Sequence, residues 1–487
     1  MTFKTKINYP LVFRIEGFML LIEGLMMLTV LPVTYLHHGL YVFSMPFSAL
    51  ITLLTGIILV IATRQHKGEK TTSRDGVFIV CVSWLVLSLF GAMPYLLSKS
   101  VPNFTDGFFE ALSGFTTTGA TILTRIEAVP KDILLWRSMT QWIGGLAIIV
   151  FSIAILPFLS MSGMQLFVSE MNGITYDKLH PRIMHTVLRI WGLYFFFTLL
   201  ETLLLYLGDM DLYDALCHSM TTISSGGFST RAESIGAFSN YSQVVVSIFM
   251  VLSGCNFSLL LLSLSWKSFT ILKNQEFRTF LIYLISISVG IAMVLTFVAH
   301  HGLGTSFREA FFSVISTMTT TGFFVSDYMA WPAFLWVMLF MLMFVGACSG
   351  STSGGVKLFR HLIFVRNSTL ELRRIIHPNA LMPVKVNGKA ISTSGVYKNT
   401  TFIIIYFLVF LVGGILLLYI GTDFNTAIGA SVATLSNVGT GVGNVGPGGS
   451  YVAFPLYAKW ILMLMMILGR VELFSLITLF SRSFWRN

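Results

Sequence analysis

The sequence predicts an all-α membrane protein with about ten transmembrane helices, and three observations support that fold class. The 487-residue chain is 55% hydrophobic and only 11% charged, with a mean hydropathy of +0.80. A soluble protein of this length could not bury so much apolar surface. Apolar stretches of roughly 20 residues, the length that a helix needs to cross a bilayer, follow one another along the chain. Basic residues gather in alternate connections between these stretches, which is typical of a chain that crosses the membrane repeatedly.

Each apolar stretch is expected to form one membrane span. The first stretch is too long for a signal peptide and is followed by many more, so we expect it to be a span as well. The net charge of +10 lies between the spans, where it sets topology and gives no support for nucleic-acid binding. The expected spans fall near 11–36, 41–63, 76–98, 133–159, 185–208, 241–265, 279–299, 332–365, 399–420 and 456–481.

The distribution of charge predicts which connections face the cytoplasm. Connections rich in Lys and Arg lie near 64–74, 267–278 and 357–398, and the positive-inside rule puts them and both termini in the cytoplasm. The opposite connections contain the strings NFTDG, GDMDLYD and GTDFNT, each of which includes aspartate. These connections are expected to face outward.

The outward connections contain a fourfold internal repeat. Its anchors are four glycines, spaced by 108 (227−119), 95 (322−227) and 117 (439−322) residues. A residue that commonly caps helix N-termini lies sixteen positions before each anchor, and an acid or Thr follows three positions after that cap. Four copies in one register indicate four copies of one structural unit. The caps and anchors are Asn103 and Gly119, Asp211 and Gly227, Ser306 and Gly322, and Asp423 and Gly439.

The repeat also predicts how the chain is divided. Residues 1–65 are expected to form two leading transmembrane helices. Four helix–pore-loop–helix units around a central pore are expected to follow, in 66–163, 164–272, 273–366 and 367–487, and the inner helix of the third should be broken.

The polar strings before the anchors suggest an ion site. A half-helix of about 12 residues covers about 18 Å, so it enters the membrane without crossing it and points its negative end inward. Glycine allows the backbone conformations that aim successive carbonyl groups the same way, and rings of such carbonyls can replace the hydration shell of an ion. A single TTTG string is more often a patch of small residues for helix packing, but four copies at one offset favour the ion site.

The strings SGFTTTGAT, TTISSGGFST, TMTTTGFF and TLSNVGTGVG resemble the four pore loops of the Trk/Ktr/HKT superfamily of potassium transporters. WRSMTQWIGG at 136–145 and ILGRVE at 467–472 are most similar to the bacterial Trk-type pore subunit. The resemblance implies a potassium selectivity filter in which each loop is a relative of Thr-Val-Gly-Tyr-Gly, although no loop keeps the Tyr-Gly ending. The ion-facing residues would be Thr117, Thr118, Gly119, Ser225, Gly226, Gly227, Thr320, Thr321, Gly322, Asn437, Val438 and Gly439.

The resemblance has further implications for the setting of the protein. It implies potassium uptake across the bacterial inner membrane, a homodimer, and a cytosolic nucleotide-binding ring subunit as regulatory partner. Potassium ions in the filter would be the only bound metal, with no covalent cofactor and no nucleic acid.

A second candidate site lies in the long span that starts near Trp331. Every residue of GACSGSTSGG is small, which disfavours a continuous helix and predicts an intramembrane loop that acts as a gate. Packing between helices through small residues is the alternative. Arg470, about ten apolar residues from either end of its span, would act with this loop or, alternatively, form a structural ion pair with an acid such as Glu201. The loop comprises Gly346, Ala347, Cys348, Ser349, Gly350, Ser351, Thr352, Ser353, Gly354 and Gly355.

The sequence agrees to different degrees with three functional classes. A gated potassium pore agrees with four loops that all run the same way. An ion-coupled carrier, driven by sodium or protons, or a less selective monovalent cation pathway is the alternative. An enzyme is disfavoured, because no Ser/His/Asp constellation or metal-ligand spacing occurs in the sequence, and the four cysteines form no CxxC motif.

Overall fold

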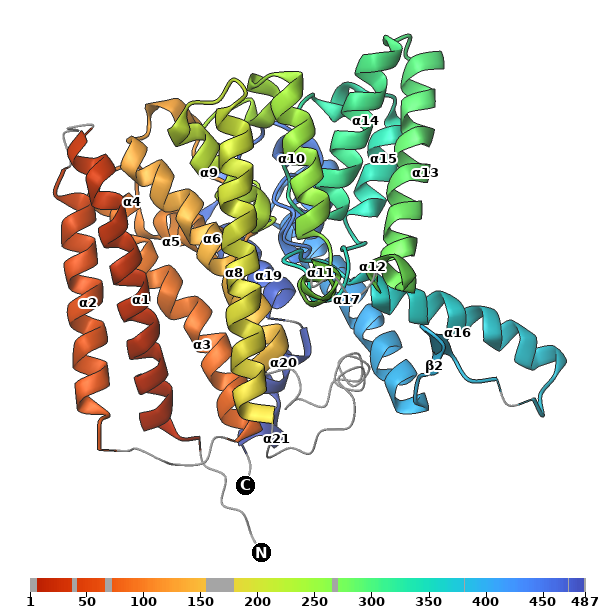
Figure 1. The fold of residues 1–487 in the computed structure, drawn as a ribbon, viewed down its shortest axis with the longest axis horizontal. Helices are drawn as coiled ribbons and strands as arrows, with labels where there is room; N and C mark the ends of the chain where they lie inside the picture. Colours follow the sequence, from red (N-terminus) through yellow and green to blue (C-terminus); the bar gives the residue numbers. More distant parts are fainter. Residues whose placement is uncertain are drawn as a thin grey trace, which may run out of the picture.

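The computed structural model describes residues 7–36, 42–65, 72–154, 179–264, 270–380, 382–471 and 473–485. Within these ranges the protein is helical apart from one two-stranded hairpin, so the all-α prediction is confirmed. Most of the long helices run roughly parallel to one another across one slab (Figure 1).

Two leading helices stand at one edge of the bundle. They are α1 (Tyr9–Leu36) and α2 (Ser44–Ala62), which pack along their length. Small residues allow this close approach, because a Cβ at Gly56 would lie 2.9 Å from the carbonyl oxygen of Gly17.

The remaining helices follow the order expected for four units. The first contains α3 (Ser73–Gly91), α4 (Met93–Leu97), α5 (Phe104–Phe115) and α6 (Lys131–Ala154). The second contains α8 (Leu179–Tyr206), α9 (Leu212–Ile223), α10 (Asn240–Ser253) and α11 (Phe257–Leu264). The third contains α12 (Thr270–Lys273), α13 (Gln275–Phe297), α14 (Leu303–Met318), α15 (Ala333–Leu342) and α16 (Leu358–Ile376). The fourth contains α17 (Thr393–Tyr419), α18 (Phe424–Leu435), α19 (Leu456–Arg470), α20 (Leu473–Phe480) and α21 (Arg482–Trp485), and short 3₁₀ turns occur at Ile126–Ala128, Ser234–Ala237, Tyr328–Ala330, Gly443–Val445 and Tyr451–Ala453.

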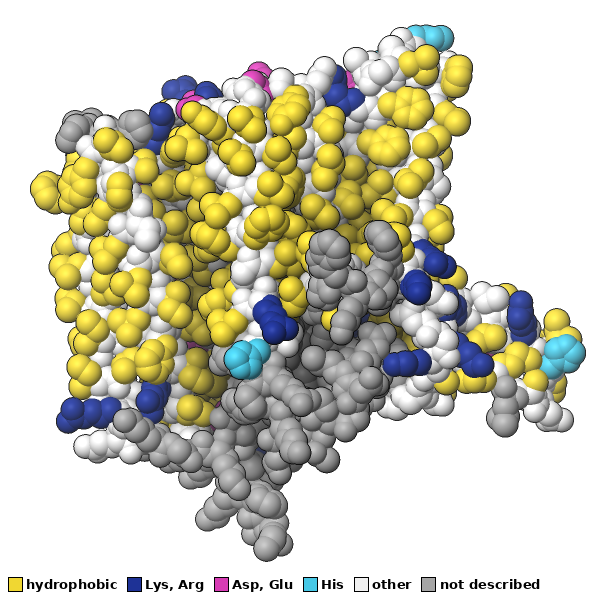
Figure 2. All heavy atoms as spheres, in the orientation of Figure 1, with side chains coloured by type: hydrophobic (Ala, Val, Ile, Leu, Met, Phe, Trp, Pro, Cys, Tyr) yellow, Lys and Arg dark blue, Asp and Glu magenta, His cyan; other side chains and the backbone are white. Residues whose placement is uncertain are grey.

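By length and composition, the described chain has fewer membrane-spanning helices than the ten that the sequence predicts. Six helices of the described chain are long and apolar enough to cross a membrane, or up to eight if two bent pairs each count as one span. The other two expected stretches correspond to α6, which carries Lys131, Asp132 and Arg137, and to α15, which has only 10 residues. Hydrophobic side chains cover the long helices in a broad band, and basic side chains lie mainly at its margins (Figure 2).

The sequence did not predict the hairpin. Strands β1 (Lys385–Val386) and β2 (Lys389–Ala390) pair in antiparallel orientation beside α16, which projects from the bundle at the level of its lower margin (Figure 1). Val384, Val386 and Ile363 form a small apolar cluster that holds the hairpin against α16. The guanidinium of Arg366 donates a hydrogen bond to the Lys385 carbonyl.

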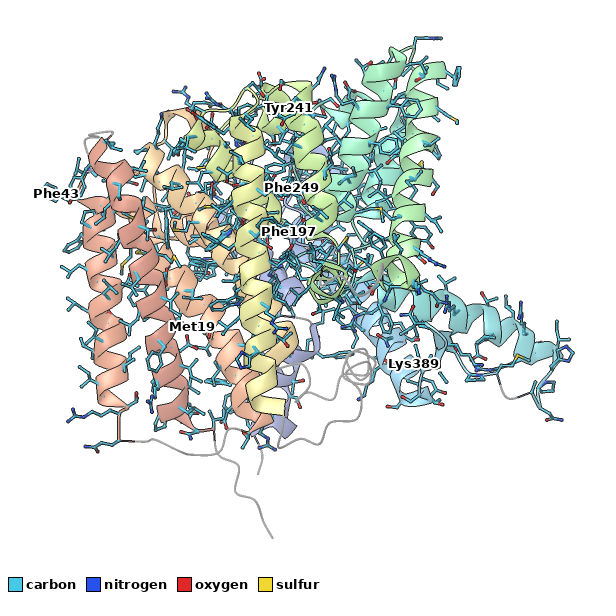
Figure 3. All side chains as sticks on the ribbon, in the orientation of Figure 1. Met19, Phe43, Phe197, Tyr241, Phe249 and Lys389 are labelled. Carbon is cyan, nitrogen blue, oxygen red and sulfur yellow. The ribbon has the colours of Figure 1, made fainter. Side chains whose placement is uncertain are left out.

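Aromatic side chains fill the space between helices, and others cover the outer surface. Phe197 of α8 and Phe249 of α10 make an edge-to-face contact at 6.4 Å, and both point into the bundle in Figure 3. Tyr241 donates its hydroxyl to the Leu204 carbonyl at the upper end of the same helix pair. Phe43, by contrast, is 83% exposed at the start of α2 and points outward (Figure 3).

Three inner helices are interrupted. The chain bends by 100° between α10 and α11, at residues 254–256. The third inner helix stops at Leu342 and resumes at Leu358. The fourth stops at Arg470 before α20 begins at Leu473. The predicted break in the third inner helix is therefore present, and the interrupted segments contact one another, as described below.

Candidate functional site

Four half-helices carry the polar strings to the centre of the bundle. They are α5, α9, α14 and α18, and each ends four residues before an anchor glycine. Three predicted caps are confirmed: the side chains of Asn103, Asp211 and Asp423 accept main-chain hydrogen bonds at 2.9, 2.6 and 3.0 Å. Hydrogen bonds from Thr426 lower the pKa of Asp423 below its ordinary value.

The fourth predicted cap, Ser306, is wrong. Helix α14 begins at Leu303 with Gly302 as its cap, and Ser306 is buried within it. Glycine is also an acceptable cap, so one extra helical turn forms before the predicted start. The acids three residues after the other caps form ion pairs: Asp106 with Lys459 at 2.6 Å and Asp214 with Arg231 at 2.9 Å.

Each half-helix ends in the same hydrogen-bonded turn. In α5, the N–H of Thr117 donates to the Gly114 carbonyl, and the N–H of Thr118 donates to the Ser113 carbonyl. The same two bonds recur after α9, α14 and α18. This is the Schellman arrangement, and it satisfies the first N–H groups of the extended segment that ends at each anchor glycine. We call these four segments, 117–119, 225–227, 320–322 and 437–439, strands one to four. The N–H groups of each strand thus bond to the half-helix that precedes it, and the carbonyls of the strand take no part in these bonds.

The turns impose an unusual backbone conformation. The residue two positions before each anchor glycine has φ between 50° and 55°, and each anchor has φ between 77° and 80°. Positive φ is uncommon for residues other than glycine, and it is a genuine outlier for β-branched threonine. Such strain persists only where the surroundings enforce it, and it clusters at functional sites. The four strained residues are Thr117, Ser225, Thr320 and Asn437.

The four strands form a closed ring. A Cβ at Gly119 would overlap the carbonyl oxygen of Gly226, and one at Gly227 would overlap that of Thr321. A Cβ at Gly322 would overlap the Val438 oxygen, and one at Gly439 would overlap the Thr118 oxygen. Each glycine therefore faces the main-chain oxygen of the next strand, in the cyclic order one, two, three, four, one. All twelve residues expected from the sequence lie in these strands, and all but Gly119, Gly227 and Gly322 are buried.

Hydroxyl groups brace the third and fourth strands at and just after their anchor glycines. Tyr451 donates to the Gly439 carbonyl at 2.7 Å, and Tyr328 donates to the Gly441 carbonyl at 2.6 Å. Thr440 donates to the Gly322 carbonyl at 2.6 Å and so joins the fourth strand to the third. These residues could not be predicted from the sequence, because their partners are main-chain atoms that no local motif indicates.

The segment 346–355 lies against the strained ends of three strands. The Gly354 N–H donates to the Thr320 hydroxyl at 2.6 Å, and the hydroxyls of Ser225 and Thr352 are 2.8 Å apart. A Cβ at Gly354 would lie 2.9 Å from the Cβ of Asn437. The segment also bonds to the bend of the second inner helix, since the Cys348 N–H donates to the Gly254 carbonyl at 3.1 Å. The ten small residues thus form a non-helical loop in contact with strands two, three and four.

Arg470 is buried, with 2% of its surface exposed, and it holds this loop. Its Nη1 donates to the Thr352 carbonyl at 2.9 Å, and its Nη2 donates to the Gly144 carbonyl of α6 at 3.0 Å. The guanidinium therefore bonds to two main-chain oxygens within the described chain and not to Glu201. The alternative ion pair between Arg470 and Glu201 is therefore not observed. Glu472 lies outside the described residues.

Two charged residues that sequence reasoning missed hold the ends of the loop. Glu276 Oε1, at the start of α13, accepts the N–H groups of Ser349 at 2.6 Å and Phe359 at 3.1 Å. Lys357 donates to the Ser353 hydroxyl at 3.0 Å. Glu276 lies in the basic connection 267–278 and in the first turn of α13, where an acid is common, so the sequence carried no signal for this role.

A second buried ion pair links the first two strands. Arg137 of α6 contacts Glu110 of α5 at 2.7 Å, and both side chains are almost fully buried. Glu110 also accepts the main-chain N–H of Ile122, just after the first strand, at 3.0 Å. Arg137 donates to the Ser229 carbonyl, just after the second strand, at 3.0 Å. The pair therefore couples the C-terminal ends of strands one and two.

Comparisons with known proteins agree with this architecture. The family described as TrkH, cation transport protein, matches residues 47–486. The "Trk system potassium uptake protein TrkH" of Salmonella typhimurium is 40% identical over 90% of this chain and 91% of the relative. The protein of the same name from Vibrio parahaemolyticus is 36% identical over 98% of this chain and 99% of the relative.

A solved structure has the same fold. It is titled "Crystal Structure of the Potassium Transporter TrkH from Vibrio parahaemolyticus", and its TM-score is 0.91 at 33% identity, over 98% of this chain and 100% of that chain. The relatives are named as transport systems, in agreement with the prediction that this chain is not an enzyme. The matches, together with the apolar helices, identify the chain as a multi-pass membrane protein that belongs to the TrkH family of cation transport proteins.

Proposed function

We propose that this chain mediates potassium uptake through a channel-like passage along the axis of the four-strand ring. The observation that carries the proposal is the closed cycle of four glycines, each in contact with a main-chain oxygen of the next strand. Oxygen rings of this kind can replace the hydration shell of a monovalent cation. The names of the relatives, Trk system potassium uptake proteins, support potassium as the ion.

The proposed filter consists of the twelve strand residues named above. Except for Gly119, their N–H groups donate to carbonyls of the half-helices, and the strand carbonyls take no part in these bonds and can act as ligands. The negative ends of four half-helix dipoles point toward the same region and favour a cation there. The strained residues Ser225 and Thr320, in strands two and three, are held by hydrogen bonds to the Gly346–Gly355 loop, which supports a preorganised site.

The proposed gate is the Gly346–Gly355 loop together with Arg470. The loop contacts three of the four strands on the side of their strained ends, where an ion leaving the filter would have to pass. Arg470 adds a positive charge to this region and ties the loop to α6. Opening would require these bonds to break and the loop to move aside.

The proposed setting is the bacterial inner membrane, with both termini in the cytoplasm. The basic connections support this orientation through the positive-inside rule. The relatives' names describe components of a Trk system, which supports further Trk partners. A homodimer and a cytosolic nucleotide-binding ring subunit are the partners that the family resemblance implies.

One alternative is an ion-coupled potassium carrier driven by sodium or protons. Another is a less selective pathway for monovalent cations. The cyclic arrangement of main-chain oxygens favours a pore. Flux through purified protein in liposomes separates the two, because a rate above about 10⁴ ions per second per molecule exceeds common turnover numbers.

Rubidium uptake into liposomes tests the filter. Gly119→Ser should lower uptake or admit sodium, because a Cβ there would overlap the Gly226 oxygen. Gly290→Ser is a matched control, since a Cβ at Gly290 in α13 would meet nothing within 4 Å. Parental uptake and parental selectivity in Gly119→Ser would refute the filter assignment.

A further inference from the structure

The second strand of the ring differs from the other three. The residue before its anchor glycine is Gly226, whereas the corresponding residues elsewhere are Thr118, Thr321 and Val438. The second strand therefore lacks the side chain that the other strands carry at this position. The backbone itself does not require a glycine, because the φ of Gly226 is not in the positive range.

The missing side chain is replaced by one from the first unit. A Cβ at Gly226 would overlap the carboxamide of Gln141, and the three nearest heavy atoms all belong to that carboxamide. Gln141 lies on α6 and is fully buried. Its amide thus occupies the space beside the second strand that a local side chain fills in the others.

The Gln141 amide also bonds to the strand on both sides of the anchor glycine. Its Nε2 donates to the Gly226 carbonyl at 2.7 Å, and its Oε1 accepts the N–H of Phe228 at 3.0 Å. The Gly226 oxygen is the same atom that a Cβ at Gly119 would overlap, so it belongs to the ring. A carboxamide has one donor group and one acceptor and can therefore fix both the direction of this carbonyl and the peptide beyond it.

Other contacts of α6 reinforce this arrangement. Arg137, one helical turn before Gln141, stacks over the Phe228 ring at 3.5 Å and bonds to the Ser229 carbonyl. One face of α6 thus holds Gly226 of the second strand together with Phe228 and Ser229, which directly follow it.

We infer that Gln141 is a positioning residue that replaces the missing side chain of the second strand and sets the potassium-over-sodium discrimination of the ring. This inference rests on the proposed filter. Without Gln141, the Gly226 peptide has no side-chain support and can turn its oxygen away from the ring, because glycine has the greatest backbone freedom. The second strand would then be the weakest of the four oxygen donors.

Three variants test the inference in purified protein in liposomes, with rubidium uptake and its inhibition by sodium as readouts. Gln141→Met keeps the volume but removes both hydrogen bonds, and it should lower the preference for rubidium over sodium about tenfold. Gly226→Val should lose most uptake, because its side chain overlaps Gln141. The double variant Gln141→Ala with Gly226→Val should regain uptake and selectivity relative to Gly226→Val, since the side chain is restored within the strand.

Gln243→Met is the matched control, because Gln243 is also buried and donates to a main-chain carbonyl, that of Phe238, outside the ring. It should keep the parental selectivity. Parental selectivity in Gln141→Met, or a double variant no better than Gly226→Val, would overturn the inference. If Gln141→Met does not fold, the double variant decides alone.

The Gly439→Ser variant separates failure of this inference from failure of the filter. If Gly439→Ser changes selectivity while Gln141→Met does not, the filter stands and the role of Gln141 is wrong. If neither variant changes selectivity, both assignments are wrong.

Discussion

Several residues around the ring have an unfavourable backbone conformation or a buried charge. Thr117 and Thr320 adopt positive φ, which costs a β-branched residue on the order of 1–3 kcal/mol, and Thr320 is held there by a bond to the loop. Arg470 is buried, and its hydrogen bonds to Thr352 and Gly144 go to main-chain oxygens, so no carboxylate of the described residues pairs with its charge. Both features are unfavourable for folding alone, and both agree with the proposed ion passage and gate.

Arg470→Ala should raise cation flux about tenfold if passage at the loop limits the rate. At about 6 Å and an effective dielectric of about 20, a guanidinium repels a monovalent cation by about 2.8 kcal/mol. That corresponds to roughly a hundredfold in rate, and the two carbonyls that share the charge reduce the effect. Liposome flux on correctly folded protein measures it, with Arg470→Lys as the variant that keeps the charge. Unchanged or reduced flux in folded Arg470→Ala would contradict the barrier.

Glu276→Ala should also increase flux, by releasing the loop from α13. The carboxylate accepts N–H groups from Ser349 and Phe359, which flank most of the loop. Glu276→Gln is the matched variant, since its remaining oxygen can accept the same two bonds, and it should stay closer to the parent. The same liposome assay applies, and equal flux in the Ala and Gln variants would show that these bonds do not hold the loop.

The sequence predicted the ring residues well but not the atoms that support them. Repetition at a fixed offset is visible in one sequence, so the anchors and three of the four caps were found. Gln141 lay in the quoted string WRSMTQWIGG, yet nothing local indicates that its amide reaches residue 226. The contacts of Tyr451 and Glu276 are also long-range and have no periodic signature. The cap at Ser306 failed because Gly302 competes for the same role.

At the scale of elements, the interrupted inner helices form one connected region. The loop between α15 and α16 bonds to the bend between α10 and α11, and it also bonds to Arg470 at the end of α19. Broken helices at membrane depth are tolerated where protein buries the backbone or where it lines a cavity. The sequence predicted the break in the third inner helix from its run of small residues, whereas the break after Arg470 has no comparable run.

Deleting Ser349–Ser353 should raise flux and weaken the dependence on any cytosolic partner. The deletion is structurally feasible, because the Gly346 N–H already donates to the Val356 carbonyl at 2.9 Å and keeps the ends of the loop together. It removes the Thr352 contacts with strand two and with Arg470. Liposome flux with and without the partner measures the effect. A shortened protein that folds but conducts no better than the parent would identify the loop as a packing element.

At the scale of the whole molecule, the two sides of the bundle differ in charge and in structure. Helices α9 and α14 lie toward the upper side in the view of Figure 1, and α16 with its hairpin lies lower and projects from the bundle. The side with α16 carries the long basic connection 357–398. The all-α class and the order of the elements followed from hydropathy and repetition. The hairpin β1–β2 did not, because two-residue strands leave no periodic pattern.

Cysteine labelling in intact cells tests the predicted orientation. Lys389→Cys in β2 should be protected from a membrane-impermeant maleimide, whereas Leu303→Cys at the start of α14, which is 64% exposed, should react. The four native cysteines are buried and provide a low background. Labelling of both positions after the cells are opened is the control. The opposite pattern in intact cells would reverse the topology.

The reversal potential of purified protein between potassium and sodium solutions tests the central claim most directly. If the ring of main-chain oxygens selects the ion, the parent should give a reversal potential that favours potassium. Gly439→Ser should move the potential toward zero, because its Cβ would overlap the Thr118 oxygen of the neighbouring strand. A reversal potential near zero in the parent, or the same potassium preference in Gly439→Ser, would contradict the account.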